Sequence, residues 1–177
     1  AFYDCYKITS ITIPDSITTI GESAFDGCTG LTSITVSSGN TNYSSIDGVL
    51  FNKDATVLVQ YPIGNTATSY VIPDSVTGIG MGAFYGCTSL TEINISSFVE
   101  SIGDFAFSNT GITSINIPDN VTNMGNYTFN SCESLASISI GSGVTSIGYY
   151  TFDGCKKLTS VIIPIGVTSV GNFAFPV

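Results

Sequence analysis

Five cysteines have the most reactive side chains in this chain. A cysteine can act as a nucleophile, form half of a disulfide, bind a metal ion, or pack as a small apolar side chain. The chain contains no histidine, so the commonest general base for activating a thiol or a serine hydroxyl is absent. Metal binding needs clustered deprotonated ligands, helped by histidine or carboxylates. Four of the cysteines instead follow a glycine or a serine, and we expect no catalytic residue, metal or cofactor.

Carboxylates are the second group that could do chemistry. Two of them about 5 to 10 Å apart on one face can hydrolyse a glycosidic bond, but only Glu92 falls on an expected sheet surface, and Glu100 lies in the turn beyond it. An aspartate recurs in a "PDS" or "PDN" turn, where stacked carboxylates could bind calcium. Three other turns have Ser or Ile at this position, so we expect turn capping instead. These aspartates are Asp15, Asp74 and Asp119.

The charge of the chain excludes two classes of partner. Four Lys and no Arg stand against 13 Asp and Glu, which gives a formal net charge of -9. Such a surface repels nucleic acids and anionic membranes. No apolar run approaches the roughly 20 residues that span a bilayer, so we expect no direct membrane insertion. With 177 residues, 43% of them hydrophobic, the chain can build the continuous core of one domain.

One sequence motif recurs along the chain, and the structure that it forms must position these side chains. It reads "IPDSITTIGESAFDGCTGLTSITV" from Ile13 and "IPDSVTGIGMGAFYGCTSLTEINI" from Ile72. Further copies begin at Ile95, Ile117 and Ile140, with a spacing of 22 or 23 residues. A fixed period of this length is typical of a solenoid. The chain begins and ends inside a repeat, so we expect it to be an excerpt of a longer protein.

The repeat explains the cysteines. Each follows a phenylalanine by three residues, so all share one position of the coil. Equivalent positions of stacked coils lie about 4.8 Å apart, which places these residues in one inward column. Parallel side chains at this spacing suit core packing better than a disulfide, which requires a specific dihedral angle. We therefore predict buried free thiols at Cys5, Cys28, Cys87, Cys132 and Cys155.

Three segments of each unit predict the walls of the coil. In "LTSITV" (31–36), strand alternation sends Ile34 and Val36 inward and leaves Ser33 and Thr35 outward. "VTSIG" adds two inward residues and a glycine that permits a positive φ. "AFxxC" is too short for a stable helix and predicts one helical or 3-10 turn. A parallel sheet opposite a bulkier turn wall makes the coil curve, with the sheet on the concave side.

The full pattern, Leu-x-x-Ile-x-Ile-Pro-x-x-Val-x-x-Ile-Gly-x-x-Ala-Phe-x-x-Cys, resembles the BspA-type, or Treponema-type, leucine-rich repeat of bacterial and protist surface proteins. It covers residues 1–36 and 67–177, with a mild departure at Asn109 and Thr110, where Gly-Cys is expected. The resemblance implies a mainly β horseshoe with a concave parallel sheet and short turn or 3-10 segments on its convex wall. It also implies an extracellular or cell-surface location and adhesion to host matrix proteins, cells or other bacteria.

Residues 37–66 break the period. Their two β-rich runs, 48–51 and 56–61, are joined by "NKDA", which suits a four-residue turn. The segment is either a β-hairpin inserted in the array or an irregular repeat with an extra strand, and loops on rigid scaffolds often carry function. We expect a single leucine-rich-repeat solenoid over residues 1–177 with this insertion.

The concave sheet is the expected binding surface. Its outward side chains are short hydroxyls and amides, which make a broad, nearly uncharged face with little side-chain entropy to lose on binding. They are Thr32, Ser33, Thr35, Thr91, Glu92, Asn94, Thr113, Ser114, Asn116, Ser137, Ser139, Thr159 and Ser160.

A module of this kind, expected to be a monomer, would bind a host or matrix protein or a surface glycan. Single contacts would be weak, and many repeats in series would supply avidity. The alternative is a structural spacer whose ligand site lies elsewhere in the longer protein. Rows of Thr and Ser also permit ice or polysaccharide binding, although that would suit a flat face better than a curved one.

Overall fold

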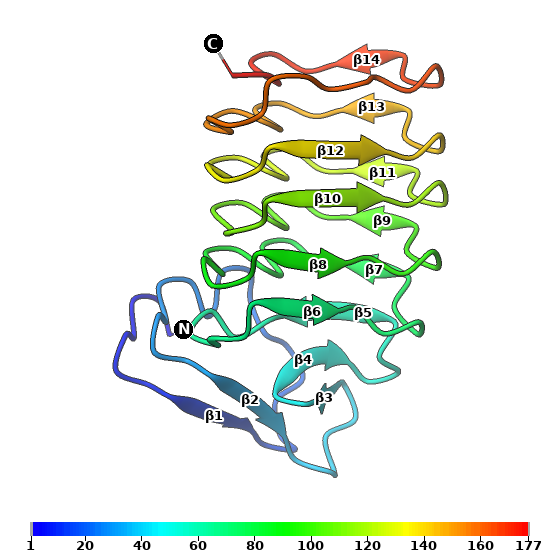
Figure 1. The fold of residues 1–177 in the computed structure, drawn as a ribbon. Helices are drawn as coiled ribbons and strands as arrows, with labels where there is room; N and C mark the ends of the chain where they lie inside the picture. Colours follow the sequence, from blue (N-terminus) through cyan, green and yellow to red (C-terminus); the bar gives the residue numbers. More distant parts are fainter. Residues whose placement is uncertain (1, 177) are drawn as a thin grey trace.

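The computed structural model describes residues 2–176 as a stack of coils made of strands and turns (Figure 1). No residue in this range is helical. The strands, in chain order, are β1 (Ser10–Ile13), β2 (Ser33–Val36), β3 (Tyr43–Ile46), β4 (Val49–Asn52), β5 (Val57–Gln60), β6 (Ser69–Val71), β7 (Gly78–Ile79), β8 (Glu92–Asn94), β9 (Ser101–Ile102), β10 (Ser114–Ile117), β11 (Asn123–Met124), β12 (Ser137–Ile140), β13 (Ser146–Ile147) and β14 (Ser169–Val170).

From β5 onward, the coils supply strands to a front sheet and a back sheet. In the front sheet, β6 pairs in parallel with β8, and β10 pairs in parallel with β12. A backbone hydrogen bond from Thr113 N to Thr91 O joins the coils of β8 and β10. In the back sheet, β5, β7, β9 and β11 pair in parallel, and β13 pairs with β14. The front sheet is the sheet predicted from the sequence. The repeat pattern does not predict the back sheet, because its strands from β7 onward have only two residues each.

The "AFxxC" segment forms a turn wall on the third side of each coil. It contains consecutive turns and no 3-10 helix within residues 2–176, because two residues per coil adopt the left-handed backbone conformation and interrupt any right-handed helix. The first of them precedes the Ala-Phe pair or its equivalent, and the second precedes the cysteine position. The first set, with φ from 54° to 61°, is Ser23, Gly82, Phe105, Tyr127, Tyr150 and Phe173.

The glycine that ends each back strand does not have the predicted positive φ. The left-handed residues do not include Gly103, Gly125 or Gly148. These glycines lie instead against the backbone of the preceding coil. A Cβ at Gly125 would stand 2.6 Å from the carbonyl carbon of Gly103, and one at Gly148 would stand 2.8 Å from the oxygen of Gly125. Glycine is therefore required for the close stacking of the coils.

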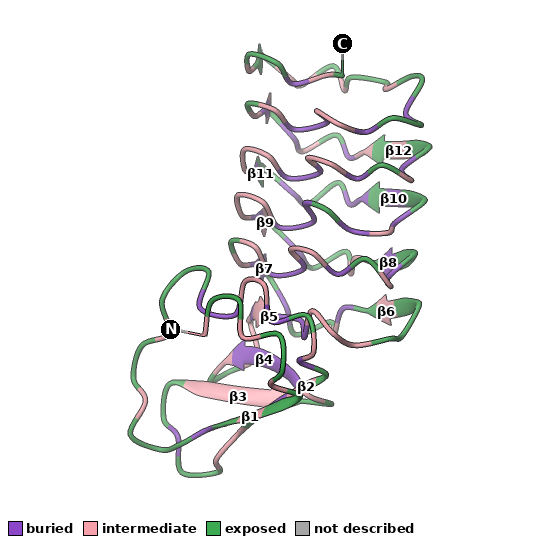
Figure 2. Cartoon of the chain, turned by 90° about the vertical axis from the view of Figure 1, so that its left-hand side faces the viewer, coloured by how far each residue is buried: buried purple, intermediate pink, exposed green. Residues whose placement is uncertain are grey.

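Buried side chains form columns along the stack. The rings of Phe84, Phe107, Phe129 and Phe152 are fully buried, and neighbouring rings stack with centroids 5.3, 5.4 and 5.7 Å apart. Inward isoleucines of the front sheet and valines before the back strands surround this column. Figure 2 shows the resulting pattern, in which buried segments recur between exposed ones from coil to coil.

Residues 37–66 contain three strands. β4 and β5 pair antiparallel and coincide with the two runs expected to form a hairpin. β3 pairs antiparallel with β4 and is an additional strand. Since β5 also pairs in parallel with β7, it occupies the back-strand position of its coil. The segment thus combines both interpretations, because two extra strands precede one that belongs to the repeat.

Candidate binding surface on the front sheet

Strand alternation positions the candidate side chains. In β10, Ile115 and Ile117 are buried, whereas Ser114 and Asn116 are exposed. Strands β8 and β12 repeat this alternation. Because side chains of a strand alternate between its two faces and the coils stack in register, the outward polar groups form columns that run from coil to coil.

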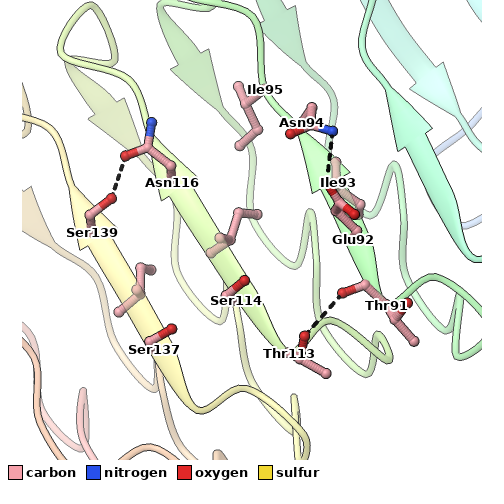
Figure 3. A pocket seen from close by; sticks show the side chains of 12 residues that line it. Thr91, Glu92, Ile93, Asn94, Ile95, Thr113, Ser114, Asn116, Ser137 and Ser139 are labelled. Carbon is pink, nitrogen blue, oxygen red and sulfur yellow. Dashed lines mark hydrogen bonds between the residues drawn. The ribbon is translucent and has the colours of Figure 1, made fainter.

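These strands line an open groove of about 570 Å³ (Figure 3). Isoleucines from the same coils contribute apolar surface between the polar groups. Eight of the residues predicted from the sequence line this groove, namely Thr91, Glu92, Asn94, Thr113, Ser114, Asn116, Ser137 and Ser139. All eight side chains are exposed. The groove can therefore offer hydrogen-bond donors and acceptors from three successive coils to one extended partner.

Hydrogen bonds hold several of these groups in place. The hydroxyl of Ser139 donates to Oδ1 of Asn116 in the neighbouring coil (Figure 3). Nδ2 of Asn94 donates to a carboxylate oxygen of Glu92 at 3.2 Å. The hydroxyl of Thr91 donates to a backbone carbonyl of the preceding coil at 3.1 Å. Side chains restrained in this way lose little conformational entropy when a ligand binds.

The groove carries one charged side chain, Glu92. The aspartates of the "PDS" and "PDN" turns lie beyond the ends of the front strands and link neighbouring coils. Oδ1 of Asp119 accepts hydrogen bonds from the backbone N–H and the hydroxyl of Ser142 at 2.8 and 3.1 Å, which hold the pKa of this carboxyl below its usual value. Asp74 accepts a similar bond from Ser96 at 2.8 Å. In these two turns the aspartate bonds the next coil, whereas the sequence analysis expected it to cap its own turn.

Three of the predicted surface residues are separated from the groove. Thr32, Ser33 and Thr35 lie in or beside β2, which pairs with β1. On the other side of β2, Ile34 N donates to the carbonyl of Gly48 at 2.8 Å. The β3–β4 hairpin therefore occupies the edge of β2 that would otherwise pair with β6. The sequence could not reveal this separation, because the inserted strands follow no repeat register.

Two more predicted residues lie at the opposite end of the front face. Thr159 and Ser160 are exposed, but the structure assigns no strand at residues 158–163. Two apolar residues of the front face were not predicted. Val71 and Ile162 are 67% and 86% exposed and occupy the outward position that Asn116 has in its own coil. Aligning the repeats would have shown that these two outward positions hold apolar residues.

The thiols take the core position predicted for them. All five cysteines are free, and four are buried, whereas Cys5 is only partly buried. Sγ of Cys132 donates to the carbonyl of Phe107 at 3.0 Å, and Sγ of Cys155 donates to that of Phe129 at 3.1 Å. Burial raises the pKa of the Cys132 thiol and raises that of Cys155 to about 12. Thiols of this kind are unreactive near neutral pH.

The groups that commonly bind metals are dispersed. Among residues 2–176, no three His, Cys, Asp or Glu side chains lie close enough together to hold a metal ion. The same part of the chain has no helix that could cross a membrane. What the front face offers a partner is hydrogen bonding and apolar contact.

Comparisons with known proteins agree with this geometry. The chain matches the family model of the BspA type leucine rich repeat region in 6 copies, over residues 1–62 and 63–176. A leucine-rich repeat protein from Eubacterium ventriosum has a similar structure, with a TM-score of 0.84 and 31% identity over 95% of this chain and 49% of that chain. A leucine rich cell surface protein from Faecalibacterium prausnitzii has a TM-score of 0.63 and 30% identity over 96% of this chain and 39% of that chain.

A leucine-rich repeat protein from T. pallidum shares 27% identity with a TM-score of 0.58, over 97% of this chain and 64% of that chain. A search of curated proteins found no match. The chain spans about half of the E. ventriosum protein and less of the F. prausnitzii protein. Repeat pattern, fold and family model together lead to one conclusion: the chain belongs to the BspA-type leucine-rich repeat family.

Proposed function

We propose that the chain is a non-enzymatic adhesion or recognition module that works outside the cell or at its surface and binds a protein or glycan through its front sheet. The observation that carries this proposal is the groove over β8, β10 and β12. Exposed hydroxyl and amide groups from three coils face the same way there, and Glu92 is the one charged residue among its lining.

The chemistry of the groove favours recognition by many weak contacts. Its side chains are short and partly restrained, so binding costs little side-chain entropy. It has no Tyr, Trp or Arg among its lining residues, and these are the usual anchors of a tight interface. Affinity would therefore accumulate over successive coils, as in other multivalent systems. The description of the F. prausnitzii relative as a cell surface protein supports the proposed location.

A second candidate function is that of a structural spacer. The length of the relatives favours this function, because the chain covers only 49% of the E. ventriosum protein. In that case the ligand site would lie in another part of the full-length protein.

A glycan and matrix-protein array separates the two candidates. We expect the chain to bind at least one component, and that component is then tested against a variant with Lys in place of Thr113, Ser114 and Asn116. Three ammonium groups would crowd an almost uncharged surface, so binding should be abolished. Folding should survive, because the changed side chains are exposed.

The matched control adds the same three charges directly after the cysteine position, beyond the end of the turn wall. Tyr6, Thr29 and Thr88 are exposed residues at one position of three different coils, and their joint replacement by Lys should leave affinity nearly intact. If the control variant loses binding and the front variant keeps it, the assignment of the binding face is wrong. An array with no bound component would favour the spacer.

A further inference from the structure

The back sheet carries a second hollow that the proposed function does not use. It has a volume of about 370 Å³ and lies over β11, β13 and β14. The hollow is open to solvent, so it suits a ligand that lies along the wall of the stack. The hollow is located on the opposite wall from the front groove, so the two could be occupied independently.

The close stacking of the coils creates this hollow. Gly125, Gly148 and Gly171 follow one another along its floor. A Cβ at Gly171 would stand 2.6 Å from the backbone nitrogen of Tyr149, so side chains are excluded from this line. The floor is consequently bare backbone, and the side chains beside it form the rim.

An open aromatic ring lies on that rim. Tyr149 is 51% exposed and lines the hollow. The neighbouring turn wall has its own column of aromatic rings, but these stack on one another, with Tyr127 and Tyr150 centroids 5.0 Å apart at an interplanar angle of 6°. None of the ring pairs among residues 2–176 includes Tyr149. Its ring face therefore remains available to a ligand.

Uncharged polar groups complete the rim. Oδ1 of Asn126 accepts a hydrogen bond from Tyr149 N at 2.9 Å, which fixes the amide and leaves its Nδ2 donors for a ligand. Ser146 and Ser169 are register partners in β13 and β14, so their hydroxyls follow each other at the spacing of the coils. No lining residue of this hollow is charged.

We propose that this hollow binds a neutral glycan, with a pyranose ring stacked on Tyr149 and its hydroxyls bonded by Asn126, Ser146 and Ser169. A pyranose presents an apolar C–H face and a rim of hydroxyls, which match an aromatic face beside uncharged amides and hydroxyls. The net charge of -9 disfavours an acidic glycan. The front groove offers no aromatic residue on which a sugar ring could stack.

Titration with soluble oligosaccharides tests this site. Cellohexaose, laminarihexaose and mannohexaose are added to isotope-labelled protein, and amide chemical shifts are followed, with hexagalacturonic acid as the anionic comparison. We expect at least one neutral hexaose to shift the amides of Ser146, Tyr149 and Ser169, and the acidic one to leave them unchanged. Tyr149→Ala should weaken binding roughly tenfold, whereas Tyr149→Phe keeps the ring and should bind like the parent.

The site is ruled out if no neutral hexaose shifts these amides, if the shifts map to β10 and β12, or if folded Tyr149→Ala binds as well as the parent. Thermal unfolding shows whether Tyr149→Ala is folded. If it is not, Tyr149→Asn removes the ring instead, because Asn126 and Asn172 occupy this position in the neighbouring coils. The front variant with Lys at 113, 114 and 116 should bind the hexaose like the parent. This result separates failure of the back-sheet site from failure of the proposed function.

Discussion

A single side-chain position shows how the repeat selects residue types. The buried thiols donate to backbone carbonyls of the preceding coil, as Cys28 does to Phe2 at 2.9 Å and Cys132 does to Phe107 at 3.0 Å. Thr110 takes the cysteine position in its own coil, and its hydroxyl donates to the carbonyl of Phe107 in the same coil at 2.8 Å. The position therefore favours a small side chain that tolerates burial and can still donate a hydrogen bond.

The buried thiols predict a loss of stability in alkaline solution. The pKa of Cys155 is raised to about 12 in the fold, against about 8.5 in an unfolded chain. Between these values the folded state keeps a proton that the unfolded state has lost, so the stability present below about pH 8.5 declines as pH rises toward 12. Urea unfolding of the parent and of Cys155→Ala should give a flatter decline for the variant. Identical slopes would contradict the burial of this thiol.

Asn40 illustrates what residue types alone could not predict. It lies in a polar loop sequence, where an exposed side chain is expected, yet it is fully buried. Its Nδ2 donates to the carbonyls of Pro14 and Ile17 at 2.8 and 2.9 Å, and its Oδ1 accepts from the backbone of Asn42 and Tyr43. This burial depends on two chain segments meeting across neighbouring coils, which no local rule describes.

At the scale of the element, the glycine that ends each back strand has a different role from the one that its sequence position suggests. Local rules associate such a glycine with a positive φ, whereas its actual constraint is the backbone of the coil stacked against it. The left-handed conformations occur instead at residues such as Tyr127 and Phe105. A left-handed residue with a side chain costs about 1 to 2 kcal/mol, and stacking of the two rings, 4.6 Å apart, offsets part of this cost.

Two glycines that differ in their contact with the preceding coil should respond differently to alanine. A Cβ at Gly125 would meet the backbone of Gly103 at 2.6 Å, whereas a Cβ at Gly166 would come no nearer than 3.3 Å to the oxygen of Ser142. We expect Gly125→Ala to lower the free energy of unfolding by about 2 to 3 kcal/mol. Gly166→Ala should change it by no more than about 0.5 kcal/mol. Urea denaturation measures both, and equal effects would show that coil contact does not explain the glycine.

Across the whole molecule, the core is divided. One cluster of buried residues includes Ile13, Phe25 and Ile34 and ends with Leu50, and a larger one continues from Val49 through the later coils. The front sheet is interrupted at the same place, where β2 contacts the β3–β4 hairpin instead of β6. Stability of a repeat array is approximately a sum over neighbouring coils, so we expect the two parts of the divided core to form separate cooperative units.

Native-state hydrogen exchange should reveal these units. Amides of β2 are expected to exchange through an opening of lower free energy than those of β12, because the smaller cluster supports them. Low concentrations of denaturant should narrow this difference, because the larger opening exposes more surface and its free energy falls more steeply. A single opening free energy for both strands would mean that the chain unfolds as one unit in spite of its divided core.

The period of the sequence was sufficient to predict the solenoid, the front strands and the inward column of cysteines. These features depend on residue positions that repeat, and eight predicted surface residues consequently lie together in the front groove. Thr32, Ser33 and Thr35 were grouped with them by repeat position alone, and the inserted hairpin separates them. The back hollow was missed because its floor is defined by contact between glycines of different coils.

The contact of each coil with its neighbours also bears on how such a gene can change. The phenylalanine, cysteine and glycine contacts all join one unit to the next. Recombination that adds or removes a whole unit therefore preserves every type of contact and alters the length of the protein by about 4.8 Å. A deletion of part of a unit would bring unlike residues into the same column. Selection can thus adjust the reach of this protein in fixed steps while its cross-section stays constant.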